Sequence, residues 1–181
     1  MNLDILLVTL FGGMLVLYSY WFIFIHRNRI DGGESVPYNR NPAWLGLSPK
    51  IVNLFIAFQL LAVIGFITGI AMWTFNDDSL QHRTLWGLDV IVLLTLFFLS
   101  AMLWAPCLYY KHRYAVVFSL VVTALASMGL LGLAIRNSSS NPVGIVSWTF
   151  LCIVTVLIDA VIWNHYYIIQ HKQEEEEEAE E

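Results

Sequence analysis

Five long apolar segments, separated by short polar stretches, make up most of this 181-residue chain. They cover about residues 3–25, 51–73, 85–110, 114–135 and 143–169. Each is longer than the roughly 20 residues that a helix needs to cross about 30 Å of hydrocarbon. The pattern predicts an all-α fold, an integral membrane bundle of five transmembrane helices, within a domain that covers residues 1–172.

Composition supports a membrane protein and separates the body of the chain from its tail. Hydrophobic residues make up 58% of the chain and charged residues 13%, whereas soluble domains carry about 25% charged residues. Residues 174–181 hold seven of the fourteen acidic side chains, so the net charge of −5 belongs to the tail. We expect residues 173–181 to be a disordered, solvated tail. The alternative is that this tail binds a basic partner.

The distribution of Lys and Arg predicts how the helices are threaded. Loops on the side that holds the C-terminus carry seven of the nine: Arg27, Arg29, Arg40, Lys50, Lys111, Arg113 and Lys172. The other side carries Arg83 and Arg136. Short loops rich in Lys and Arg stay in the cytoplasm, which places the N-terminus outside or in a lumen and the C-terminus in the cytoplasm. The long apolar segments suit the thicker plasma membrane or the late secretory pathway.

Several residues mark the side predicted to be outside. Trp73, Trp86 and Trp148 are expected at the headgroup level, where amphipathic rings are enriched. Asp89 is expected one turn inside the third helix, near enough to water and to Arg83 to be solvated or paired. Asn137 begins the glycosylation sequon Asn-Ser-Ser, although its closeness to the membrane argues against glycosylation.

Asp159 is the candidate site residue because an ionisable side chain inside a membrane helix is costly and is a functional hypothesis by default. It lies about ten residues from the cytoplasmic end of the fifth segment, or about 15 Å deep at 1.5 Å per residue. Gln59 in the second segment lies at a matching depth and is its expected partner. Asp159 is therefore either a proton or cation site, or half of a hydrogen-bonded clamp between helices, and the clamp is the simpler interpretation.

Two groups of small residues are candidates for helix packing. Gly65 and Gly69 form a GxxxG pattern, which lets another backbone approach closely. Ser119, Thr123 and Ser127 repeat every four residues in the fourth segment, so they share one face. This second face packs either inside the protein or against a partner. The very short connection near residue 112 also predicts that the third and fourth helices are antiparallel neighbours.

The sequence carries no motif that indicates catalysis, a cofactor, a metal or nucleic acid. It has no P-loop, no HExxH, no potassium-filter sequence and no lysine inside an apolar segment. We therefore expect a non-enzymatic membrane protein that acts as a subunit, adaptor or organiser of a membrane complex and binds other membrane proteins through helix packing. The alternative is a small transporter or channel component that uses Asp159 with Gln59. A lipid-modifying enzyme is disfavoured because no polar cluster converges at one interface.

Overall fold

The computed structural model describes residues 1–30, 47–110, 112–138 and 142–169, and the acidic tail lies outside these ranges. The long helices are α1 (Leu3–Ile30), α2 (Pro49–Phe75), α3 (Val90–Tyr109), α4 (Arg113–Arg136) and α5 (Pro142–Cys152), which continues directly into the π-helix η4 (Ile153–Trp163). The described part of the chain holds five helices long and apolar enough to cross a membrane, the last over Val143–Ile169. The predicted helical membrane bundle is confirmed at this level.

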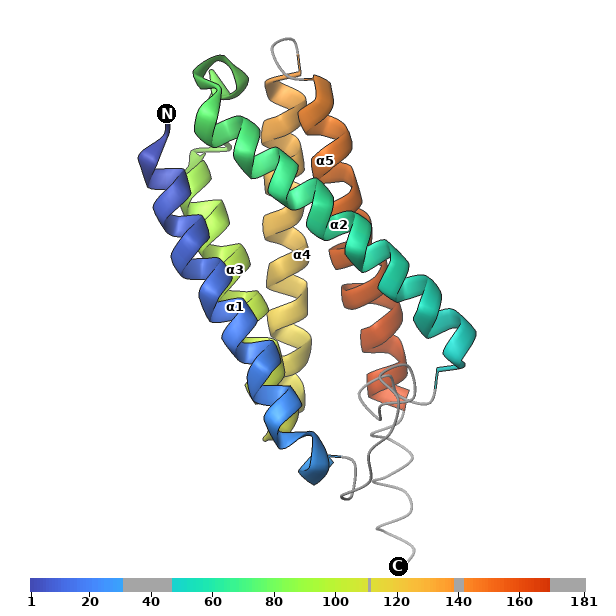
Figure 1. Ribbon diagram of the computed structural model, residues 1–181. Coiled ribbons are helices and arrows are strands. Elements are labelled where there is room, and N and C mark those ends of the chain that lie inside the picture. The colour runs from blue at the N-terminus through green and yellow to red at the C-terminus, as the bar shows by residue number, and fades with distance from the viewer. Residues whose placement is uncertain (31–46, 111, 139–141, 170–181) are drawn as a thin grey trace, which may run out of the picture.

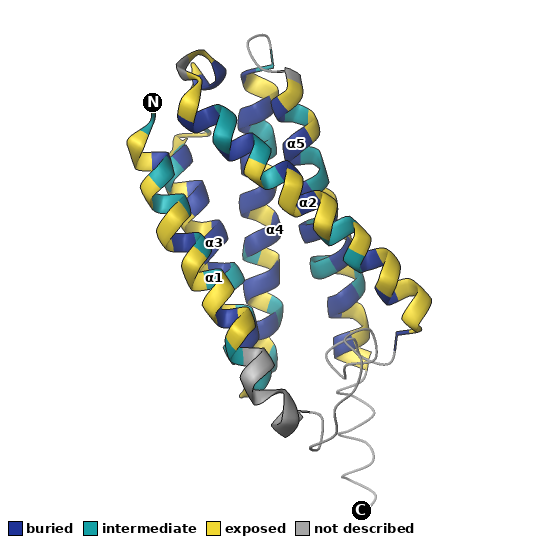
Figure 2. Ribbon diagram, viewed as in Figure 1, coloured by how far each residue is buried: buried dark blue, intermediate teal, exposed yellow. Residues whose placement is uncertain are grey.

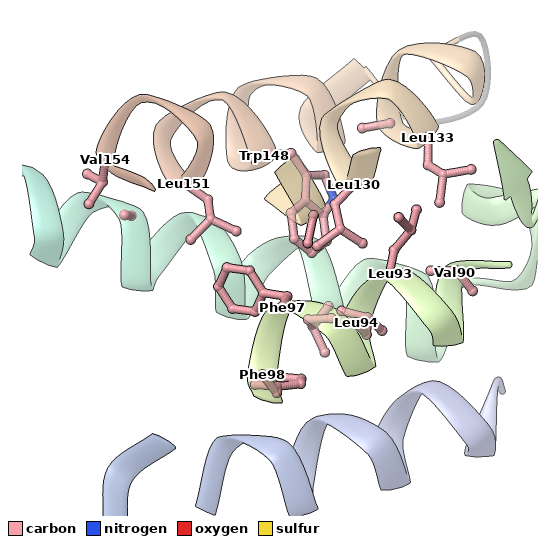
Figure 3. Packing of buried hydrophobic residues seen from close by; sticks show 14 of the residues in the cluster. Val90, Leu93, Leu94, Phe97, Phe98, Leu130, Leu133, Trp148, Leu151 and Val154 are labelled. Atoms are coloured by element: carbon pink, nitrogen blue, oxygen red, sulfur yellow. The ribbon is translucent and has the colours of Figure 1, made fainter. Parts of the chain in front are cut away.

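The helices form an up-and-down bundle in which α1 lies beside α3, α3 beside α4, and α2 crosses α5 (Figure 1). The short connection near residue 112 makes α3 and α4 neighbours, as predicted. We call the end of the bundle where α1 begins the Asn2 end, and the end where α4 begins the His112 end. The core toward the Asn2 end is aromatic, because the rings of Phe97, Phe98 and Trp148 each contact the ring of Phe66. Figure 3 shows Phe97, Phe98 and Trp148 among the buried residues.

The third helix begins five residues later than predicted. Thr84–Leu85 and Leu88–Asp89 form an antiparallel two-stranded ribbon, and α3 starts at Val90. The turn between the strands has positive φ at both central residues, 51° at Trp86 and 81° at Gly87, which is typical of a tight hairpin. Asp89 is the N-cap of α3, because its Oδ1 accepts a hydrogen bond from the Ile91 N–H. An acidic cap is a strong helix start, and the apolar residues before it concealed this boundary.

The expectation that Trp73 and Trp148 lie at the headgroup level is wrong. Both side chains are fully buried, and their rings stack with centroids 4.4 Å apart. They fill the space between α2 and α5 instead of facing the lipid boundary. Trp86 differs, since it is 85% exposed at the tip of the hairpin.

Arg83 ties three helices together at the Asn2 end. Its guanidinium forms an ion pair with Asp4 of α1 and lies 3.7 Å from the carboxylate of the α3 cap, Asp89. The hydrogen bond with Asp4 raises the pKa of Arg83 above its ordinary value, so the guanidinium stays charged. Asn2 extends the connection to α2, because its side chain donates to the Trp73 carbonyl at 2.6 Å. The expected closeness of Arg83 and Asp89 is confirmed, whereas the pairing with Asp4 was not foreseen.

Asn137, the asparagine of the sequon, is a structural residue. It is 2% exposed. Its amide nitrogen donates to the carbonyls of Leu133 and His82, and its oxygen accepts from the His82 N–H at 2.9 Å. The side chain holds the loop before the hairpin against the end of α4. A glycan on this nitrogen is incompatible with the folded arrangement.

Candidate intramembrane polar site

Asp159 lies in η4. By the threading predicted from the sequence, this is the cytoplasmic half of the fifth span. Asp159 is half-buried, and no hydrogen bond or ion pair of its carboxyl group is found within residues 1–30, 47–110, 112–138 and 142–169. A carboxyl group in a helical bundle normally finds a polar partner, because an unsatisfied polar group in an apolar environment is costly. The polar residues on the neighbouring helices are therefore the candidates for a hydrogen-bond partner of Asp159.

Gln59, the expected partner, is half-buried on α2. The contacts of Gly65 with Ser147 and of Gly69 with Trp148 set the register between α2 and α5. Following this antiparallel register toward the His112 end places Gln59 at a depth within about one turn of that of Asp159. The two residues are at similar depth, but the described part of the structure holds no hydrogen bond between them.

The predicted packing residues of α4 lie on the opposite side of Asp159 from α2. Ser119, Thr123 and Ser127 are all at least 95% buried. The Ser127 hydroxyl is 2.5 Å from the hydroxyl of Thr155 in η4. Thr123 donates to Ser100 of α3 at 2.8 Å. These hydroxyls join α4 to both of its neighbours, so this small polar face packs inside the protein.

The Ser127–Thr155 hydrogen bond sets the register between α4 and η4. The helices are antiparallel, so one turn further along each brings Thr123 level with Asp159. One more turn brings Ser119 level with Asn164, whose backbone N–H donates to the Asp159 carbonyl. Three polar levels therefore follow one another along the interface of α3, α4 and η4. We call this set the polar column, and its members are Ser100, Ser119, Thr123, Ser127, Thr155, Asp159 and Asn164.

Two buried polar atoms near the column lack a hydrogen-bond partner within the described residues. They are the Asn164 Oδ1, an acceptor, and the Trp104 Nε1, a donor. Asn164 is 5% exposed, and its amide nitrogen donates to the Ala160 carbonyl at 3.1 Å. The ring of Trp104 meets that of Trp163 edge-on, with centroids 5.7 Å apart. Buried polar atoms are nearly always paired, so these two atoms are unsatisfied within the described part of the structure.

Gly65 and Gly69 both face α5 within the chain. A Cβ atom at Gly65 would lie 2.5 Å from the carbonyl oxygen of Ser147, and one at Gly69 would lie 2.9 Å from the indole of Trp148. The backbones of α2 and α5 thus approach closely along this pair. The contact lies where α2 crosses α5.

Sequence reasoning missed several residues of the site. Ser100 and Thr155 are ordinary residues in apolar segments, and only their hydrogen bonds to α4 reveal a role. Asn164 lies near the end of the apolar segment, where a polar residue suits the membrane interface. The available signal was that Asn164 lies five residues after Asp159. Residues five apart do not share a face in an α-helix, but they do in a π-helix.

The chemistry available to the polar column is binding through oxygen atoms. It offers one carboxyl group, one free amide oxygen and several hydroxyls. No group of three or more His, Cys, Asp and Glu that could hold a metal ion occurs among the described residues. Hydroxyls whose protons go to backbone carbonyls, as with Thr155 and the Leu151 carbonyl at 3.0 Å, still offer oxygen lone pairs. No family model, curated protein or solved structure matches this chain.

Proposed function

We propose that this protein is a non-enzymatic subunit, adaptor or organiser of a membrane complex, and that it binds other membrane proteins through the free face of α1. The proposal rests on how little of α1 is used inside the chain. Only 17% of its apolar window is buried, against 56% for α4. Figure 2 shows α1 mostly exposed along its length.

The exposed face of α1 has the spacing of a helix-packing seam. Its side chains alternate between four-residue and three-residue steps and are 45–69% exposed. They are Leu3, Leu7, Leu10, Met14, Leu17 and Trp21. A repeat of this kind keeps one seam turned toward a partner helix. The exposed face of α4 has the same spacing, so α1 is distinguished by how little of its apolar window is buried within the chain.

Substitution within the seam tests this proposal. The full-length protein is purified in mild detergent, with and without the changes Leu10→Ala and Leu17→Ala. We expect the changed protein to fold but to lose co-purifying membrane proteins, which mass spectrometry identifies. Leu125→Ala with Met128→Ala is the matched control, because both residues are exposed on α4. Equal recovery of partners by both variants would refute binding through α1.

A second candidate function is a small transporter or channel component that uses Asp159 with Gln59. The supporting observation is that Asp159 is half-buried, lies on a π-helix, and has no hydrogen-bond partner among the described residues. π-helical turns occur frequently at functional sites. Ion flux into proteoliposomes that contain the purified protein tests this candidate. Flux that Asp159→Asn abolishes without loss of folding supports it, and an absence of flux excludes transport by the chain alone.

The proposed threading places the Asn2 end outside or in a lumen and the C-terminus in the cytoplasm of the plasma membrane or late secretory pathway. It rests on the bias of Lys and Arg toward the His112 end and its loops. The acidic tail is then available to a basic cytoplasmic partner. Protease added to intact cells should spare a C-terminal epitope and remove it after permeabilisation. Removal of the epitope from intact cells would reverse the orientation.

A further inference from the structure

We propose that the polar column binds one small monovalent cation, a proton or a sodium ion, between the Asp159 carboxylate, the Asn164 Oδ1 and the Thr123 hydroxyl oxygen. The site belongs to the interface of α3, α4 and η4, and it does not use Gln59. It concerns binding alone, so it stands whether the protein organises a complex or moves an ion.

The helix face of Asp159 supports this placement. Thr155, one turn before it, bonds to α4, and Trp163, one turn after it, packs among Val116 and Leu120 of α4. Both flanking residues are about 95% buried. Asp159 shares the face that these two residues turn toward α4. Asp159 as a whole residue is half-buried.

The arrangement of hydrogen bonds explains why the site takes a cation. The Asn164 amide nitrogen is committed to the Ala160 carbonyl, which leaves its oxygen as the buried, unpaired atom. Thr123 donates its proton to Ser100 or to the Ser119 carbonyl, so its oxygen faces the site as an acceptor. Oxygen atoms from a carboxylate, an amide and a hydroxyl are the ligands that hard cations prefer.

Within the described helices around Asp159, cationic side chains are confined to the ends, where His165 directly follows Asn164. The stretches 90–109, 114–135 and 143–164 contain no Lys, Arg or His, and the other ionisable groups on these helices near the column are the thiols Cys107 and Cys152. On α2 the single cationic residue is Lys50, in the first turn at the His112 end. A carboxylate at this depth therefore needs a bound positive charge to be stable.

The Trp104 Nε1 completes the site as a donor. The Ser100–Thr123 hydrogen bond sets the register between α3 and α4. Trp104 lies one turn after Ser100, and Ser119 lies one turn before Thr123, so the two are level. A water molecule at this level accepts from the indole N–H and donates to the Asn164 oxygen or the carboxylate. A buried water typically makes about three hydrogen bonds to polar groups that would otherwise be unsatisfied. Hydration of this kind suits a site that exchanges a cation.

Infrared difference spectroscopy of the full chain in lipid membranes tests the proposal. The protonated carboxyl band of Asp159 is isolated by subtracting the spectrum of Asp159→Asn. For a proton site, we expect the band to disappear as the pH rises, and sodium chloride in place of choline chloride to have no effect. For a sodium site, sodium chloride removes the band at constant pH. Asp159→Glu provides a second reference, since it keeps the carboxyl group and shifts its band.

Variants around the carboxyl group test the ligands. Asn164→Ala and Thr123→Val should each weaken binding of the proton or sodium ion by about tenfold. This is the lower end of the loss of affinity that follows removal of a supporting ligand. Gln59→Leu is the matched control and should leave the midpoint unchanged. A carboxyl group that remains protonated, or remains ionised, under all these conditions overturns the proposal. A midpoint that moves with Gln59→Leu but not with Asn164→Ala also overturns it.

Discussion

Replacing Gly65 with alanine tests how closely α2 and α5 approach each other. A Cβ atom there would lie 2.5 Å from the backbone oxygen of Ser147. Ordinary van der Waals contact begins at 3.4 Å, so the backbones must separate by about 0.9 Å to relieve the clash. The obstacle is backbone, which no change of rotamer removes. Helix separation also disturbs the stack of Trp73 on Trp148, the residue that follows Ser147.

The expected magnitude comes from two opposing effects. Alanine in place of glycine stabilises a helix interior by roughly 0.5–1 kcal/mol. Overpacking of a close interface costs about 1–3 kcal/mol. Gly65→Ala should therefore lower the free energy of unfolding by about 1 kcal/mol, and by roughly 2.5 kcal/mol at most. Gly13 on α1 is the matched control, because nothing lies within 4 Å of its added Cβ.

The assay is reversible unfolding in mixed micelles at increasing fractions of denaturing detergent. Unfolding is monitored by the near-ultraviolet circular dichroism of the tryptophans. Gly13→Ala should be as stable as the unchanged protein or more stable. Gly69→Ala should fall between the two, since the added Cβ meets the Trp148 side chain at 2.9 Å and a side chain can shift. If Gly65→Ala proves as stable as Gly13→Ala, the close approach of α2 and α5 is refuted.

Three further predictions concern the Asn2 end and the polar column. Asn137→Ala should cost about 1–3 kcal/mol of stability, because it leaves backbone groups of the His82 loop unpaired. Endoglycosidase treatment should not change the gel mobility of the unchanged protein, because Asn137 is buried. Trp86→Asn should raise stability by about 1 kcal/mol in thermal unfolding, since asparagine tolerates positive φ better; a decrease would show that the Trp86 ring makes a stabilising contact. A double-mutant cycle of Ser127→Ala and Thr155→Val should give a coupling of about 0.6–1.7 kcal/mol, and additive effects would exclude the hydrogen bond as a clamp.

The membrane helices could be predicted from sequence because length and hydrophobicity suffice for them. The α3 boundary could not, since Leu85, Trp86 and Leu88 continue the apolar character of the span while the backbone forms a ribbon. Gly87 and Asp89 were the available signals, as a turn residue and an N-cap. The burial of Trp148 was equally hidden, because a tryptophan near a helix end suits the headgroup region and a buried stack alike.

The candidate site was predictable in its parts but not in its assembly. Asp159 stands out because any carboxylate in an apolar segment does. The repeat of Ser119, Thr123 and Ser127 stands out by its spacing. That these two features lie at one interface depends on the register between α4 and η4, which the Thr155 hydrogen bond fixes in the structure. Depth alone paired Asp159 with Gln59, because depth does not tell which face of a helix a residue occupies.

The π-helix gives the assembly its physical reason. At about 100° per residue, an α-helix would turn Asn164 by roughly 140° away from the direction of Asp159. In η4 the Asn164 N–H donates to the Asp159 carbonyl, five residues back, so the two residues lie on successive turns of one face. π-helical geometry is rare and marks functional sites more often than chance. Here it places Asp159 and Asn164 on successive turns of the helix that Thr155 joins to α4, as the proposed cation site requires.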